Sequence, residues 1–148
     1  HAKYNINFTH TIDPAGRKHC LWIKDVDITL TYTPTVYVAS NYKAGSCRYD
    51  LTQGHELQHV NTDIITIKEL LPYIRQSTET ALAQWYSIGP VDDAKMQESQ
   101  GSLSKRLSDI LDKVIENVRQ SRTLRQQMVD SREEYRRLSS ACQKEPVH

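Results

Sequence analysis

The chain has 148 residues, of which 38% are hydrophobic and 25% are charged. This length suits a single domain, residues 1–148, that can bury its own core, and no apolar run approaches the ~20 residues that a membrane-spanning helix needs. The net charge of +1 is too balanced for a protein whose main ligand is a phosphate backbone. We therefore expect neither a membrane span nor a nucleic-acid partner.

Residues 1–50 have the pattern of β-strands. Apolar and polar residues alternate over residues 4–8 and again over residues 23–32, as they do in strands with one buried face. The Asp-Pro-Ala-Gly sequence at residues 13–16 predicts a turn. Residues 35–39 also predict a strand, which could serve as an edge that holds an extended peptide. This half should contain three or four short antiparallel strands.

From residue 51 onward the period of the apolar residues is helical. The first helix is indicated by steps of three and four residues at Leu57, Ile64, Ile67, Leu71 and Ile74. Thr52 or Asp50 could cap its start, and Pro72 should kink it or split it. A second helix, residues 94–142, carries a stripe with near-heptad spacing at Leu103, Leu107, Ile110, Val114, Val118, Ser121, Met128, Tyr135 and Leu138.

These patterns predict an α+β fold. A small antiparallel sheet from the β-rich residues 1–50 should pack on a long antiparallel helical hairpin from residues 51–148, kinked or split at its proline. Both parts are expected to belong to one domain.

The stretch with the clearest chemistry is His55-Glu56-Leu57-Gln58-His59, which has the H-E-x-x-H pattern. Residues four apart lie one above the other on a helix, so the imidazoles of His55 and His59 can bind one zinc ion from a single face. The neighbouring Glu56 can take a proton from water whose pKa the metal lowers to about 7. The motif predicts one Zn²⁺ per chain, with Glu56 as the general base.

An H-E-x-x-H helix behind a short strand resembles the zincin metallopeptidases. Together with residues 20–30 (Cys-Leu-Trp-Ile-Lys-Asp-Val-Asp-Ile-Thr-Leu) and the Thr-Pro pair at 33–34, the motif looks like the bacterial domain family described as predicted secreted zinc-dependent proteases. This resemblance covers about residues 20–75. It implies a zincin-like active-site helix, His55 and His59 as metal ligands, Glu56 as general base, a peptide or protein as substrate, and export. The residues after His59 lack the third-ligand continuation of the metzincins, so that subclass is excluded.

A catalytic zinc usually has three protein ligands, and the gluzincin pattern would take the third from a glutamate on the next helix. Glu79 stands at such a position. This role requires the motif helix to end and the chain to reverse before Glu79. If the helix is continuous, its rise of 1.5 Å per residue places Glu79 ~30 Å from His59.

The helical hairpin offers a second arrangement, because facing residues of two antiparallel helices have a constant sum of residue numbers. If Cys47 and Cys142 meet, the sum is 189, so His55 faces Glu134 and His59 faces Asp130. Because Glu134 also lies near the stripe of Tyr135 and Leu138, we rank Glu134 first as the third metal ligand, Asp130 second and Glu79 third. The alternatives for the acidic residues of this segment are ion pairs with neighbouring arginines, or a carboxylate that only orients a ligand imidazole.

Three other side chains are weaker candidates. Tyr135 adjoins Glu134 and could act as a catalytic residue by donating a hydrogen bond to an oxyanion, or it could be part of the core. His10 and His19 could in principle complete a metal site, but both lie in the strand region near a turn.

Three cysteines, Cys20, Cys47 and Cys142, are an odd number for a disulfide scaffold. One disulfide with one remaining thiol would fit an exported protein, with Cys47–Cys142 and Cys20–Cys47 as competing pairings, and three reduced cysteines are the alternative. The chain begins with His1 and carries no signal segment, which fits a secreted or periplasmic protein whose signal has been removed.

The sequence therefore predicts a zinc metallopeptidase that hydrolyses peptide bonds with metal-activated water. The alternative is a non-catalytic interaction module, with or without a structural metal, whose helical hairpin binds a partner helix or a second copy.

Overall fold

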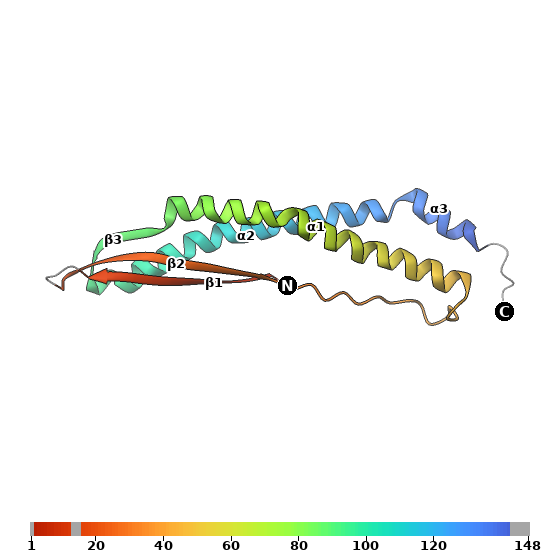
Figure 1. The fold of residues 1–148 in the computed structure, drawn as a ribbon, viewed down its shortest axis with the longest axis horizontal. Coiled ribbons are helices and arrows are strands. Elements are labelled where there is room, and N and C mark those ends of the chain that lie inside the picture. Colours follow the sequence, from red (N-terminus) through yellow and green to blue (C-terminus); the bar gives the residue numbers. More distant parts are fainter. Residues whose placement is uncertain (1, 13–15, 143–148) are drawn as a thin grey trace. The chain divides into compact units, whose positions relative to one another are not determined.

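The computed structural model describes residues 2–12 and 16–142. Its elements, in chain order, are the strands β1 (Ala2–Ile12) and β2 (Lys18–Leu30), the helix α1 (Cys47–Trp85), the strand β3 (Ser87–Asp92), the 3₁₀ turn η1 (Asp93–Lys95) and the helices α2 (Met96–Val129) and α3 (Arg132–Ala141) (Figure 1). The strands form one antiparallel sheet in the order β1-β2-β3. The predicted α+β class, a small antiparallel sheet with two long helices, is confirmed.

The chain divides into two compact units, and each draws on both halves of the sequence. The first combines the residues up to Tyr32 with Leu71–Asn117, and we call it the sheet unit. The second combines Thr33–Leu70 with the residues from Val118 onward, and we call it the disulfide unit.

In the sheet unit, β1 and β2 pair from Ala2 opposite Leu30 onward, with one irregularity after Asn7. This confirms the two strands that the alternation predicts; most of the predicted turn between them falls on residues 13–15, outside the described residues. The third strand, β3, was not predicted, because Ser-Ile-Gly-Pro looks like a helix terminator. Gly89 in this strand has a φ of +138°, and a Cβ there would lie 2.7 Å from the carbonyl oxygen of His19, so the close strand approach requires glycine.

The core of the sheet unit is formed where α1 and α2 meet the sheet. Its fully buried members are Ala81, Leu107 and Leu111, and the partly buried residues packed against them are Tyr4, Ile6, Ile23, Val26, Ile28, Leu82 and Ile110. The predicted stripe of α2 is thus buried at Leu103, Leu107 and Val114. Burial of this apolar surface is the main stabilising term of the unit.

The predicted strand at residues 35–39 is wrong. This segment has no strand pairing, although its burial still alternates, with half-buried valines on either side of Tyr37, which is 80% exposed. Alternation records which side chains face the protein, whereas a strand also needs a neighbour for its backbone hydrogen bonds. The proposed peptide-holding edge is therefore not formed by these residues.

The first helix begins earlier than predicted and is not split. Ser46 caps it: its hydroxyl accepts a hydrogen bond from the amide of Tyr49 at 3.2 Å, so neither Thr52 nor Asp50 is the cap. Pro72 lies inside α1, and the helix continues through it to Trp85.

The prediction of one continuous second helix over residues 94–142 is wrong. It ends at Val129, and α3 begins at Arg132. Between them Ser131 adopts an extended conformation and caps α3, accepting a hydrogen bond from the amide of Glu134 at 3.2 Å. Met128, in the last turn of α2, and Tyr135, in α3, are 76% and 56% exposed, so neither is part of a core.

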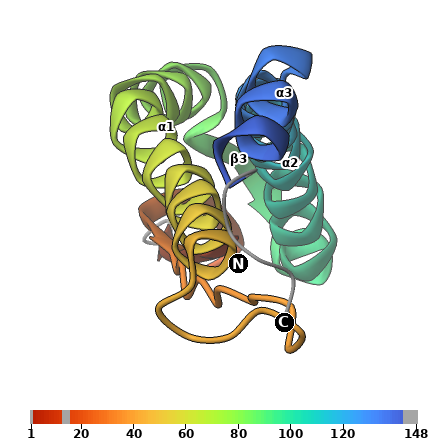
Figure 2. The same ribbon diagram turned by 90° about the vertical axis from the view of Figure 1, so that its right-hand side faces the viewer.

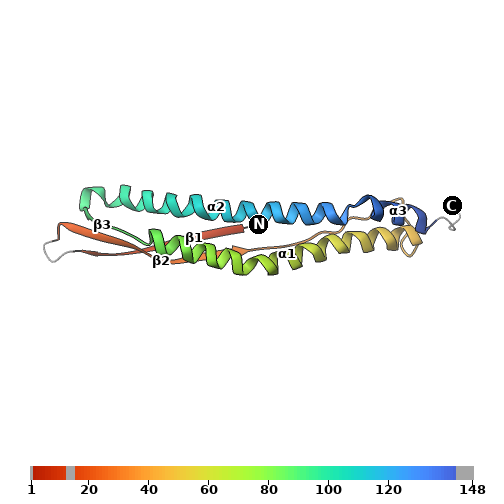
Figure 3. The same ribbon diagram turned by 90° about the horizontal axis from the view of Figure 1, so that it is seen from above.

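In the disulfide unit, the first part of α1 runs antiparallel to the end of α2 and to α3 (Figure 3). Figure 2 shows the start of α1 and α3 side by side. This unit buries polar side chains on α1, with His55, Asp63 and Thr66 exposed by 7%, 2% and 0%. Among the described helices of the whole chain, none combines the length and apolar character of a membrane span.

Candidate metal centre

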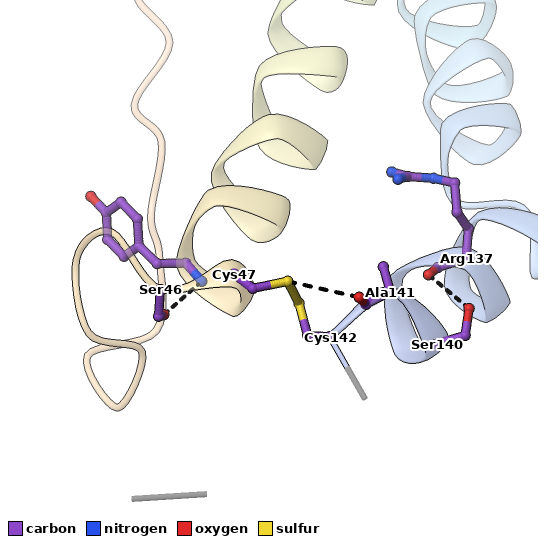
Figure 4. Close-up of a disulfide and its surroundings, with 7 residues drawn as sticks. Ser46, Cys47, Arg137, Ser140, Ala141 and Cys142 are labelled. Carbon is purple, nitrogen blue, oxygen red and sulfur yellow. Dashed lines mark hydrogen bonds between the residues drawn. A yellow bond between two sulfur atoms is a disulfide. The ribbon is translucent and has the colours of Figure 1, made fainter. Parts of the chain in front are cut away.

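A disulfide between Cys47 and Cys142 fixes the pairing of α1 with α3. It joins the first residue of α1 to the residue that follows α3, and the Cys47 sulfur also lies 3.9 Å from the carbonyl oxygen of Ala141 (Figure 4). The pairing Cys47–Cys142 is thus confirmed, the competing pairing Cys20–Cys47 is wrong, and Cys20 is a free, half-buried cysteine. Because the two ends are tied, residues whose numbers add up to about 189 face one another.

This register brings three possible ligand atoms to one point. The Nε2 atoms of His55 and His59 are 3.2 Å apart, and the Oδ1 atom of Asp130 lies 3.3 Å from the first and 3.1 Å from the second. Ligand atoms held ~2.05 Å from a tetrahedral zinc lie ~3.3 Å from one another. The three side chains therefore form a group that could hold one metal ion, and its donor set of two imidazoles and a carboxylate suits zinc and several other divalent ions.

The geometry also explains why a cation suits this point. If both Nε2 atoms carry lone pairs, two imidazoles and a carboxylate present three acceptors to one another at about hydrogen-bond distance, an arrangement that is repulsive unless a proton or a cation lies between them. A single proton can bridge only one pair of these atoms. A divalent ion satisfies all three.

Glu134, the first choice for the third ligand, occupies a different place. Its Oε1 lies 3.5 Å from Nδ1 of His55, on the far side of the ring from Asp130. That Nδ1 is buried and makes no hydrogen bond of good geometry among the described residues, and the carboxylate of Glu134 lies beside it. Glu134 thus lies where the alternative prediction, a carboxylate that only orients a ligand imidazole, would place it, and Asp130, ranked second, is the acidic residue of the group that could hold a metal.

Glu134 is itself held by an arginine. Arg137 donates to both of its oxygens, at 2.7 and 2.6 Å, and these hydrogen bonds lower the pKa of the Glu134 carboxyl group to about 2. The carboxylate is therefore ionised at neutral pH and is fixed beside His55.

Asp130 lies in the two-residue break between α2 and α3, where it contacts both histidines. Its Oδ1 also accepts a hydrogen bond from the hydroxyl of Tyr135 at 3.3 Å. The negative charge of Asp130 raises the pKa of the Tyr135 hydroxyl, so this phenol remains protonated and can donate. The ring of Tyr135 lies 6.2 Å from that of His55, so this tyrosine lies beside the candidate metal centre.

The candidate metal centre opens into a cleft of about 510 Å³. Glu56 lines this cleft beside the three candidate ligands and is half-buried. The other walls are formed by Tyr42, Arg48, Leu51, Thr52, Tyr135, Leu138, Ser139 and Cys142. Glu56 and the three candidate ligands therefore share one open cleft.

The remaining candidates are not brought to this cleft. α1 does not end between His59 and Glu79, as a ligand role for Glu79 requires, and Glu79 instead pairs with Arg75 at 2.9 Å. His10 and His19 belong to the sheet unit, where Nε2 of the buried His19 lies 3.1 Å from Asp93.

Sequence reasoning missed the residue behind His59. The Oε1 atom of Gln126 contacts Nδ1 of His59, so both imidazoles have an oxygen acceptor on the side away from the metal point. The constant sum of 189 pairs Gln126 with Asp63, and the two do form a hydrogen bond. The sequence Ser131-Arg-Glu-Glu134 is a recognised helix-start pattern and could have revealed the break that positions Asp130.

Comparisons of the chain with protein-family models, with curated proteins and with solved structures found no match. The class of site is therefore defined by its own atoms: two imidazoles, a carboxylate, a neighbouring glutamate and an open cleft.

Proposed function

We propose that the protein is a zinc-dependent peptidase whose metal is held by His55, His59 and Asp130. The observation that carries the proposal is the convergence of their three ligand atoms, each within 3.3 Å of the other two, beside Glu56 in an open cleft. Three protein ligands leave a fourth position for water or substrate, which is typical of catalytic zinc and not of structural zinc.

Each side chain has a separate role in this proposal. When bound, zinc supplies Lewis-acid chemistry, polarising a carbonyl group and acidifying water. Glu56 takes the proton of the attacking water and passes it to the departing amine. Tyr135, whose hydroxyl already lies at Asp130, donates to the oxygen that gains charge during attack.

The proposal includes a location outside the cytoplasm. A disulfide is consistent with an extracytoplasmic compartment, because the cytosol keeps thiols reduced. A secreted or periplasmic peptidase would act there on peptide or protein substrates.

The test is the substitution Glu56→Gln in the full chain, with Glu133→Gln as the matched control. Glu133 is an exposed glutamate of α3 that does not line the cleft. We expect Glu56→Gln to retain about one zinc per chain, measured by elemental analysis, and to lose about 10²- to 10⁴-fold in the hydrolysis of labelled casein. The control should keep both properties.

The other outcomes separate the proposal from its alternatives. Equal hydrolysis by wild type and Glu56→Gln contradicts the mechanism. Zinc in a wild-type protein that hydrolyses neither casein nor a peptide library indicates a structural metal in a non-catalytic module. Absence of zinc from protein purified without chelator, and failure to bind it when it is added, indicate a module without a metal.

A further inference from the structure

The polar interior of the disulfide unit contains a chain of hydrogen bonds that ends on His59. Arg122 donates to both oxygens of Asp63 at 2.7 Å, and Asp63 is only 2% exposed. Asp63 accepts from Nε2 of Gln126, and Oε1 of Gln126 contacts Nδ1 of His59. None of these three residues belongs to the group that could hold the metal.

The orientation of the Gln126 amide is determined by its surroundings. The two ends of a glutamine amide look alike by shape, and only hydrogen-bond partners assign them. Here Nε2 has two acceptors, the carbonyl oxygen of His59 at 3.0 Å and the carboxylate of Asp63. The opposite orientation would point an oxygen at two oxygens, so Oε1 must face the ring of His59.

This orientation decides which nitrogen of His59 carries the proton. Oε1 can only accept, so Nδ1 of His59 must be the N–H donor of the neutral ring. The lone pair is then left on Nε2, the atom that lies 3.1 Å from Asp130 and 3.2 Å from Nε2 of His55. A ring with the opposite tautomer would present an N–H to the metal point and would have to shift its proton before binding.

We infer that Gln126 is a positioning residue, which holds His59 in the Nδ1–H tautomer so that Nε2 is ready for the metal. This inference rests on the proposed metal site and deepens it. The role requires an amide. A glutamate at position 126 would be a stronger acceptor for His59. Its negative charge would, however, repel the carboxylate of Asp63, and it would have no N–H to donate to the His59 carbonyl.

The two ligand histidines are thereby supported in different ways. His55 has an anionic carboxylate behind it, Glu134 with Arg137. His59 has the neutral amide of Gln126 behind it. That amide in turn contacts Asp63, which is paired with Arg122. Both supports end on an arginine, which balances the buried or half-buried carboxylate.

The experiment measures the tautomer of His59 in the metal-free full chain by long-range ¹H–¹⁵N NMR, at about pH 8, where ordinary imidazoles are neutral. We expect the Nδ1–H pattern in the wild type and its loss in Gln126→Met, which keeps the length of the side chain and removes its hydrogen bonds. Gln127→Met is the matched control, because Gln127 is the adjacent, exposed glutamine of α2, and it should behave as the wild type. A wild-type His59 in the Nε2–H form overturns the inference, and so does an unchanged tautomer in Gln126→Met.

Zinc affinity, measured by competition with a chromophoric chelator, gives the second readout. Loss of an outer hydrogen-bond partner of a ligand histidine typically costs about 10- to 100-fold in metal affinity, and we expect a loss of this size for Gln126→Met and for Gln126→Glu. Wild-type or tighter binding by Gln126→Glu overturns the requirement for an amide. Since the tautomer is measured without metal, a wild type that binds no zinc refutes the proposed function while the test of Gln126 still stands.

Discussion

Removing the Cys47–Cys142 disulfide should open the disulfide unit while the sheet unit stays folded. The bond joins the start of α1 to the residue after α3, and the candidate ligands come from both segments: His55 and His59 from α1, and Asp130 from the break before α3. Once the two segments can separate, the three candidate ligand atoms are no longer held close enough to bind one ion.

The size of the effect follows from the length of the loop that the bond closes. For a sequence separation of 95 residues, the chain-entropy model gives a stabilisation of about 4.7 kcal/mol at 25 °C. If the sheet unit remains folded and only the two segments of the disulfide unit are released, the free loop is about 50 residues, and the value falls only to about 4 kcal/mol because it depends on a logarithm.

Little apolar burial is present to compensate for this loss. Among the described residues of the disulfide unit, the only buried apolar side chain is Cys142, which is half of the bond itself. The unit is otherwise stabilised by polar contacts such as the pair of Asp63 with Arg122. A loss of about 4 kcal/mol is a large share of the 5–15 kcal/mol that stabilise an ordinary domain.

The assay is hydrogen exchange followed by mass spectrometry on the double variant Cys47→Ser/Cys142→Ser. We expect amides of α1 before Leu70 to exchange up to about 10³-fold faster, since each 1.36 kcal/mol is a factor of ten, whereas β1, β2 and the first half of α2 should be unchanged. Cys20→Ser is the control, because that cysteine is free. Exchange in α1 that stays within about threefold of the wild type, or an equal increase in the sheet, would refute the reasoning.

Two further predictions concern the metal centre and the sheet. Asp130→Asn should lower zinc affinity more than Glu134→Gln, for which about 10- to 100-fold is expected, and titration with a competing chelator would contradict the assignment if the order were reversed. Gly89→Ala should destabilise the sheet unit by about 1–3 kcal/mol, because its φ is positive and the new Cβ would meet the His19 carbonyl at 2.7 Å. Gly101→Ala changes a helical position with open space around it, so it should stabilise the sheet unit in the same thermal unfolding experiment.

The parts of the fold that depend on local pattern could be predicted from the sequence. Alternation located β1 and β2, and three- and four-residue steps located both long helices. The facing-residue sum also placed both acidic candidates opposite the histidines, because a disulfide at the end of an antiparallel pair fixes its register. The facing-residue sum could not, however, rank Asp130 and Glu134 as candidates for the third ligand.

That order depends on the break at residues 130–131. On one continuous helix, Asp130 and Glu134 would lie a turn apart on the same face, and nothing would distinguish them. The break re-aims Asp130 toward both Nε2 atoms and leaves Glu134 beside Nδ1 of His55. The prediction of a strand at residues 35–39 was wrong, and β3 was missed, for a different reason. Strand pairing is a long-range property that local alternation cannot specify.

The break between α2 and α3 also places part of the cleft wall on a helix to which the candidate carboxylate ligand does not belong. Asp130 follows directly from the last turn of α2, whereas Leu138 and Ser139 of the cleft wall stand on α3. Substituting Leu138 or Ser139 would alter what the cleft accepts without changing Asp130, whereas Glu134 and Tyr135 of the same helix contact His55 and Asp130 and would have to be kept. With those two residues kept, the wall of the cleft and the candidate metal-binding carboxylate could be changed separately.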